Sequence, residues 1–258
     1  MRFKAGFSYQ FKTYLKALGW FYVWAIAGIV ILPTLITVVL GQAQHYTLSD
    51  ALPGGLTSIV LGIFLVVYGA ITYDGFKLFI QNGIGRKTYF WSKTAVLGVI
   101  VLVGEVINVL YGWLYENVIT SRHSGTMVFF DLYGKCFHNQ VADRLAVVVI
   151  TILFIGCFLA TSMAVGSILG LFSRRVQIIL IVGIPILLFI ILTVLISVNT
   201  TSSLKLTWIY DALTFMVGYH KQAQGYLNPF APMISGTLYI LIMLGISYGF
   251  TLKLRVPR

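Results

Sequence analysis

The sequence predicts an all-helical integral membrane protein with six transmembrane helices, folded as a single domain over residues 1–258. The chain is 59% hydrophobic and only 10% charged, whereas about a quarter of the residues of a soluble domain are charged. It also contains six apolar runs long enough to cross a bilayer, which takes about 20 residues per helix. Basic residues alternate between the connecting loops, as they do in multi-pass proteins. These observations exclude soluble enzymes, nucleic-acid-binding domains and disordered scaffolds.

The apolar runs define the predicted spans and leave two long outer loops, residues 116–143 and 199–232. The spans cover residues 18–40, 56–73, 94–115, 145–172, 176–198 and 233–252. Pro33 lies inside the first span, and Gly183 and Pro185 lie inside the fifth. Kinks are expected at these positions, because neighbouring helices can satisfy the backbone groups that a proline leaves unpaired.

Charge placement predicts the orientation of the chain. Thirteen Lys and Arg residues lie on one side, in the N-terminal segment, the second and fourth loops and the C-terminus, against five on the other side. Basic residues favour the cytoplasmic side, so both termini are expected in the cytoplasm. Five of the seven acidic residues fall on the outer side. The net charge of +11 is therefore explained by topology, and no nucleic-acid partner is expected.

Residues 1–17 are predicted to form an amphipathic helix that lies on the cytoplasmic leaflet of the bilayer before the chain turns into the first span. Large apolar side chains recur there at three- and four-residue spacing: Phe3, Phe7, Phe11, Tyr14, Leu15 and Leu18. Lys4, Lys12 and Lys16 occupy another face, a pattern typical of interfacial helices. The alternatives are a plain basic flank of the first span and a cleaved signal peptide. The apolar run is too long for a signal peptide.

The loop between the second and third spans, residues 74–93, is predicted to be a docking segment. It reads DGFKLFIQNGIGRKTYFWSK. On a short helix, its apolar side chains would form one stripe: Phe76, Phe79, Ile80 and Ile84. Two amides, two helix-breaking glycines and two basic residues accompany the stripe: Gln81, Asn82, Gly83, Gly85, Arg86 and Lys87. Such a helix suits a groove on a cytoplasmic partner. GIGRKT is not a Walker A loop, because it lacks the GxxxxGK[ST] spacing and the preceding strand.

The stretch FKLFIQNGIGRKTYF resembles the coupling-helix region of small type-2 ABC-exporter permeases, which occur in Gram-positive drug, bacteriocin and peptide exporters. The N-terminal amphipathic segment, the six predicted spans and the cytoplasmic termini fit the same family pattern. That family also has re-entrant outer helices before the last span. Residues 204–219 carry apolar side chains at helical spacing in the corresponding place, before Asn228, Pro229 and Pro232 interrupt the chain. The outer loop 116–143 departs from the pattern by its length.

The resemblance implies half of a bacterial cell-membrane exporter, paired with a second permease as a homo- or heterodimer. A dimer of separate ATPase subunits would bind ATP and Mg, and this chain would bind no cofactor and carry no catalytic residue. The residues implied to contact the ATPase are Phe76, Phe79, Gln81, Asn82, Gly83, Arg86 and Lys87. A basic membrane loop without a partner is the alternative.

Two polar residues inside the third span are candidates for the translocation path, because a charge in mid-bilayer costs about 2.5–3.5 kcal/mol. Glu105 lies near the middle of the span, and Asn108 follows one turn later on the same face. Three roles fit these residues. They line a cavity for a cationic or polar substrate group, they act in a proton relay, or they are simply a buried pair within the bundle. The apolar spans favour a hydrophobic or amphipathic substrate, such as a peptide, an antimicrobial or a drug-like molecule.

Small residues line two faces of the fourth span, either for packing within the chain or for a dimer seam. They are Gly156, Ala160, Ala164, Ser162, Gly166 and Gly170. No metal-ligand spacing and no catalytic motif is present, so neither a metal site nor an enzyme is expected. Cys136 lies in an outer loop and Cys157 inside a span, so the two should not pair.

Two further functions stay open. A proton-coupled secondary transporter would use Glu105, but the sequence shows none of the internal inverted repeats that would support it. A non-transporting immunity or sensor subunit would share the exporter fold and the same ATPase partner.

Overall fold

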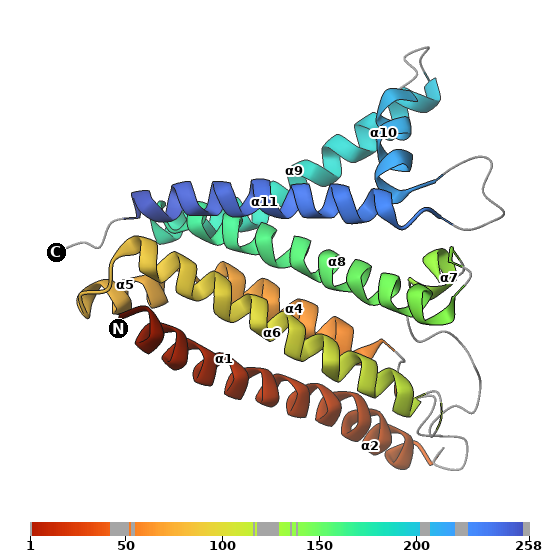
Figure 1. Cartoon of the computed structure of the whole chain (residues 1–258), viewed down its shortest axis with the longest axis horizontal. Coiled ribbons are helices and arrows are strands. Elements are labelled where there is room, and N and C mark those ends of the chain that lie inside the picture. Colours follow the sequence, from red (N-terminus) through yellow and green to blue (C-terminus); the bar gives the residue numbers. More distant parts are fainter. Residues whose placement is uncertain are drawn as a thin grey trace.

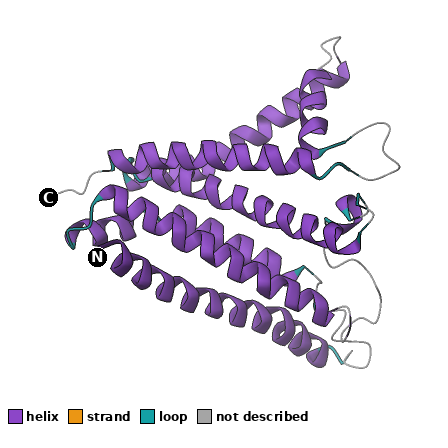
Figure 2. Cartoon of the chain, in the orientation of Figure 1, coloured by secondary structure: helices purple, strands orange, loops and turns teal. Residues whose placement is uncertain are grey.

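The computed structural model describes residues 2–41, 52, 55–115, 117, 129–134, 136–137, 139–201, 207–219 and 227–254. This part of the chain is helical and contains no strand (Figure 1; Figure 2). The elements are α1 (Arg2–Ile26), the π-helical segment η1 (Ala27–Ile31), α2 (Leu32–Val39), α4 (Leu56–Ala70), α5 (Tyr73–Gln81), α6 (Arg86–Leu114), α7 (Phe130–Tyr133), α8 (Gln140–Leu169), α9 (Arg174–Thr201), α10 (Thr207–Val217) and α11 (Phe230–Lys253).

Several of these helices are long and apolar enough to cross a membrane. Among the described residues, five segments qualify: Phe3–Val39, Arg86–Leu114, Gln140–Leu169, Arg174–Ile191 and Phe230–Lys253. α4 and α5 make a sixth only if they count as one bent span, because their axes differ by 51°. The prediction of an all-helical fold is confirmed, and these helices support a multi-pass membrane protein. The six-span layout stays a prediction.

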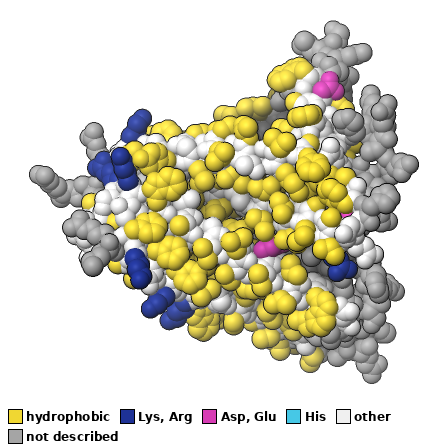
Figure 3. Space-filling view, in the orientation of Figure 1, with side chains coloured by type: hydrophobic (Ala, Val, Ile, Leu, Met, Phe, Trp, Pro, Cys, Tyr) yellow, Lys and Arg dark blue, Asp and Glu magenta, His cyan; other side chains and the backbone are white. Residues whose placement is uncertain are grey.

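The helices form a bundle whose two ends differ. The start of α1, the short helix α5 and the end of α11 lie together at one end, and α7 and α10 lie toward the other (Figure 1). Most Lys and Arg side chains visible in Figure 3 gather at the end that holds α5. Within the bundle, α8 packs against α4 and α11, while α6 packs against α1 and α4. The segments that the charge pattern assigns to one side of a membrane are therefore close together in space.

The structure corrects the prediction of a separate interfacial helix at residues 1–17. The first helix runs from Arg2 through η1 and α2 to Val39, and it makes no turn near residue 17. Phe7, Phe11 and Tyr14 pack against a buried cluster that includes residues of α4, α6 and α8. Gln10 accepts a hydrogen bond from Ser92 of α6 at 3.1 Å. The predicted turn near residue 17 is therefore wrong. Protein covers the apolar stripe only in part, because Phe3 and Leu15 are 45% and 40% exposed.

The kink expected at Pro33 takes the form of a π-helical widening. Pro33 lies in the first turn of α2 and has no N–H to donate to the preceding turn. The five residues Ala27–Ile31 directly before α2 adopt the wider π-helical geometry, which accommodates the missing bond. In α9 the helix continues through Pro185.

The small residues of α8 pack within the chain. A Cβ atom added at Gly166 would overlap the backbone of Ala70 at the end of α4, and one added at Gly156 would lie 3.0 Å from Ile240 of α11. Ser162 Oγ, on the α4 side, donates to the carbonyl oxygen of Leu65 at 3.3 Å. Close approach of α4 and α11 therefore explains both faces without a dimer seam.

At the end of the bundle opposite α5, the helix expected within residues 204–219 is present as α10 (Thr207–Val217) (Figure 1). Tyr133 of α7 donates through its hydroxyl to the carbonyl of Val217 at 2.8 Å, which ties α7 to the end of α10. Re-entry of this segment into a membrane stays a prediction. Within the predicted outer loops, residues 116, 118–128, 135, 138, 202–206 and 220–226 lie outside the described residues.

Candidate functional site

A buried lysine fixes the break between α4 and α5. Lys93, the eighth residue of α6, is only 1% exposed. Its Nζ donates to three oxygens at the end of α4: Gly69 O at 2.8 Å, Thr72 Oγ1 at 3.0 Å and Ile71 O at 3.1 Å. Carbonyls at a helix C-terminus lack partners within the helix and carry partial negative charge, so they suit an ammonium donor. All three N–H groups are satisfied, as a buried ammonium requires.

The short helix α5 rests on a cluster of four side chains, which we name the α5 seat: Phe76, Phe79, Tyr89 and Leu254. The Tyr89 ring lies edge-to-face against Phe76 and Phe79, with centroids 5.6 and 5.3 Å apart. Its hydroxyl donates to the carbonyl of Thr72 at 2.8 Å. The α5 seat thus joins α5 to α6 and to the residue that follows α11.

The turn between α5 and α6 is closed by glycine, as the sequence predicts. Gly83 has a φ of +73°, a conformation that favours glycine at the end of a helix. Ile84 N donates to Phe79 O at 2.9 Å, and Gly83 N donates to Ile80 O at 3.0 Å. This pair of bonds is a Schellman motif, which satisfies the last carbonyls of α5. We name residues 81–87 the α5–α6 turn.

The structure divides the residues predicted to contact an ATPase into two groups. Those of the α5–α6 turn are exposed: Gln81, Asn82, Gly83, Arg86 and Lys87. Phe76 and Phe79, in contrast, are 0% and 3% exposed within the α5 seat. The prediction that these two rings contact a partner is therefore corrected. The two rings pack against Tyr89 and Leu254 of the same chain. These two side chains therefore cover the apolar face of α5 that the sequence predicts to be open to a partner.

Arg86 connects the α5–α6 turn to the last helix. Its Nη1 donates to the carbonyl of Leu252, in the last turn of α11, at 2.7 Å. A cation is favourable at this position for the same reason as Lys93 at the end of α4. The first residue of α6 therefore holds the end of α11, while Lys93 holds the end of α4.

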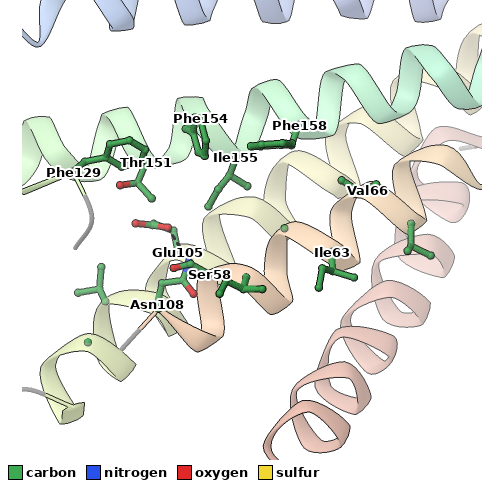
Figure 4. A pocket seen from close by; sticks show the side chains of 16 residues that line it. Ser58, Ile63, Val66, Glu105, Asn108, Phe129, Thr151, Phe154, Ile155 and Phe158 are labelled. Carbon is green, nitrogen blue, oxygen red and sulfur yellow. Dashed lines mark hydrogen bonds between the residues drawn. The ribbon is translucent and has the colours of Figure 1, made fainter. Parts of the chain in front are cut away.

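Glu105 and Asn108 lie in a second place, the wall of a cavity of about 700 Å³ between α4, α6 and α8 (Figure 4). We name this cavity the lateral groove. Asn108 Nδ2 donates to Glu105 Oε2 at 3.1 Å. Most of the remaining lining is apolar: Ile59, Ile63, Val66, Val67, Val109, Phe129, Phe154, Ile155 and Phe158, with Ser58, Thr151 and three glycines. The structure thus brings the two predicted residues together and places them on a cavity.

Sequence reasoning missed the roles of Lys93 and Tyr89. The sequence places Lys93 in the loop between the second and third spans, because the apolar run begins at residue 94. In the structure, however, α6 begins at Arg86 and includes Lys93. The sequence does carry one signal for them. Tyr89 and Lys93 are four residues apart at the start of an apolar helix, so they lie on the same face of it. The groove walls contributed by α8 carry no comparable sequence signal.

Among the described residues, no group of three His, Cys, Asp or Glu side chains could hold a metal ion. Cys136 and Cys157 are both free thiols.

Comparison with known proteins identifies no relative: no protein-family model, no curated protein and no solved structure matches the chain. The likeness of residues 76–90 to exporter coupling helices therefore stays a prediction from the sequence.

Proposed function

We propose that the chain is a permease subunit of an ATP-driven exporter in a bacterial cell membrane, with cytoplasmic termini. Separate ATPase subunits, which bind ATP and Mg, dock on the α5–α6 turn. A second permease, identical or different, completes the translocation path for a hydrophobic or amphipathic substrate. The chain itself carries no catalytic residue.

One observation supports this proposal most: an exposed basic turn leads directly into α6, and the start of α6 is hydrogen-bonded to the ends of two other helices. Lys93 holds the end of α4, Arg86 holds the end of α11, and both belong to α6. A force applied to the turn by a closing ATPase dimer would move these helix ends together. A plain connecting loop needs no such attachment.

The attachment also links the turn to the lateral groove. α4 and α6 form two walls of the groove, and the end of α4 packs on α8, which forms the third. Small shifts of one packed helix past another are a common way of transmitting a conformational change. Movement of the turn would therefore alter the width of the groove and its access.

Two alternatives keep part of this account. In a proton-coupled transporter, Glu105 would carry the proton and the α5–α6 turn would need no partner. In an immunity or sensor subunit, the ATPase would dock on the same turn without substrate export. A proton-coupled transporter would not associate with an ATPase, so a measurement of association distinguishes it from our proposal. An immunity or sensor subunit would associate with the ATPase but export no substrate, so a measurement of substrate flux distinguishes it.

The test is co-purification of the tagged full chain with a Walker A ATPase, followed by assay of ATP hydrolysis. Lys87→Glu and Asn82→Lys change the exposed turn, and we expect either to abolish association. Arg86→Glu is less informative, since it also removes the hydrogen bond to Leu252. Lys12→Glu, at an exposed position of α1, is the control with the same charge change. Association that survives both turn variants would refute docking at this site.

A further inference from the structure

The lateral groove combines an apolar lining with one carboxyl group. Its volume of about 700 Å³ lies within the range of sites for drug-sized ligands. The groove opens on the side of the bundle rather than along its axis. Ile59 and Ile63, on the α4 wall, are 59% and 54% exposed, and the hollow between the helices is visible in Figure 3. In a membrane protein this side faces lipid, so the groove is accessible to molecules dissolved in the bilayer.

The polar pair inside the groove lacks a cation. Glu105 is 6% exposed and extends from α6 toward the groove (Figure 4). Among the described residues, its one hydrogen-bond donor is the Asn108 amide, and no Lys, Arg or His charge acts on it. Asn108 Oδ1 is buried without any donor. The site therefore places the Glu105 carboxyl group beside an apolar cavity, and next to it lies the buried amide oxygen of Asn108, an acceptor without a donor.

Aromatic rings cover the α8 side of the same cavity. Phe154 stacks edge-to-face with Phe158 at 4.9 Å and with Phe129 at 5.2 Å. Thr151, one turn before Ile155, adds a hydroxyl oxygen to the wall that faces Glu105 (Figure 4). Rings of this kind suit an alkyl or aryl body and attract a nearby cation.

We propose that the lateral groove binds an amphiphilic amine, with its ammonium group on Glu105 and Asn108 and its apolar body against Phe154 and Phe158. The ammonium N–H groups donate to the Glu105 carboxylate and to Asn108 Oδ1, which supplies the missing cation and the missing donor together. An acyl chain or a helix of a second copy would fill the apolar space but leave Glu105 without a cation and Asn108 Oδ1 without a donor. This proposal rests on the proposed transport function and names its substrate class.

The experiment measures binding to the full chain alone, in nanodiscs of neutral phosphatidylcholine, so that anionic lipid does not attract the probe. The probe is a dansyl-labelled octylamine with a free primary amine, and empty nanodiscs give the background. Octylamine, octanol and octanoate, which share one apolar body, are the competitors. We expect octylamine to displace the probe and the other two to fail.

Two variants locate the site. Glu105→Gln keeps the size of the side chain and removes its charge, and we expect affinity to fall about 30-fold or more, whereas Glu105→Asp retains part of it. Ile63→Trp fills the groove from α4 without touching Glu105, and we expect it to abolish binding. This second variant gives an answer even if Glu105→Gln does not fold, as judged by size-exclusion chromatography.

Three results would overturn the proposal. Equal affinity in Glu105→Gln would exclude the carboxylate, and equal competition by octanol or octanoate would indicate an acyl-chain groove. A dimer in the nanodisc that binds no probe would indicate that a second copy covers the groove. Because no ATPase is present, each of these results leaves docking on the α5–α6 turn untouched, and loss of ATPase association leaves the binding result untouched.

Discussion

Removal of one ring from the α5 seat should release α5 from the bundle. Phe76 is 0% exposed and packs on Tyr89, at the end of the bundle where Lys and Arg side chains gather (Figure 3). Phe76→Ala loses the transfer free energy of the ring and leaves a cavity, which together cost about 3–5 kcal/mol in protein cores. Leu78 lies on the same helix and is 43% exposed, so Leu78→Ala should cost only about 1 kcal/mol.

Hydrogen–deuterium exchange of residues 73–88 measures this difference directly. A loss of about 3 kcal/mol corresponds to roughly 100-fold faster exchange through local opening, against less than about tenfold for Leu78→Ala. Exchange in α8 should remain unchanged in both variants, which excludes global unfolding. Equal exchange in the two variants would show that α5 is not seated on α6.

Three further predictions concern helix packing and orientation. Lys93→Glu puts a buried anion against the carbonyls that end α4, so we expect at least about 3 kcal/mol of destabilisation and loss of the monodisperse peak in size-exclusion chromatography. Gly166→Val forces a side chain into the backbone of α4 and should lower the melting temperature, whereas Gly245→Val, which meets no atom within 4 Å, should not; equal effects would contradict the packing. Cys136 is exposed and follows α7, which lies at the end of the bundle opposite α5 (Figure 1). An impermeant maleimide should therefore label it in intact cells, and labelling only after lysis would reverse the orientation.

The sequence predicts the helical elements well because apolar runs and glycine or proline positions act locally. The Gly83 break, the irregularity before Pro33 and the helix at α10 all follow from residues next to them in the chain. The sequence does not predict how α4 continues into α5, because the 51° bend between the two helices depends on contacts with other helices. Local patterns therefore identify the elements and their ends.

Contacts between helices are harder to predict, and they account for the corrections. The stripes on residues 1–17 and on α5 are both amphipathic, and most of their apolar side chains pack against other helices of the same chain. A single sequence shows that a face is apolar without showing what covers it. In the same way, Lys93 can lie inside the protein only because α4 ends beside it, which depends on tertiary structure.

The candidate site was predicted in part. The spacing of Glu105 and Asn108 predicts a shared face, and the structure adds the hydrogen bond between them and the groove beside them. The aromatic wall comes from α8, about fifty residues further along the chain, so no local pattern could indicate it. For the α5–α6 turn, the structure separates the exposed residues from the two buried rings.

Site-specific photo-crosslinking from position 87 tests docking on the α5–α6 turn most directly. A photoreactive residue replaces Lys87, which is exposed in the turn, and in a control it replaces Val141, which is exposed in the first turn of α8. Irradiation of native membranes should give an adduct between position 87 and a chain that contains a Walker A motif, and no such adduct from position 141. Adducts from position 87 with lipid or with this chain alone would contradict the account.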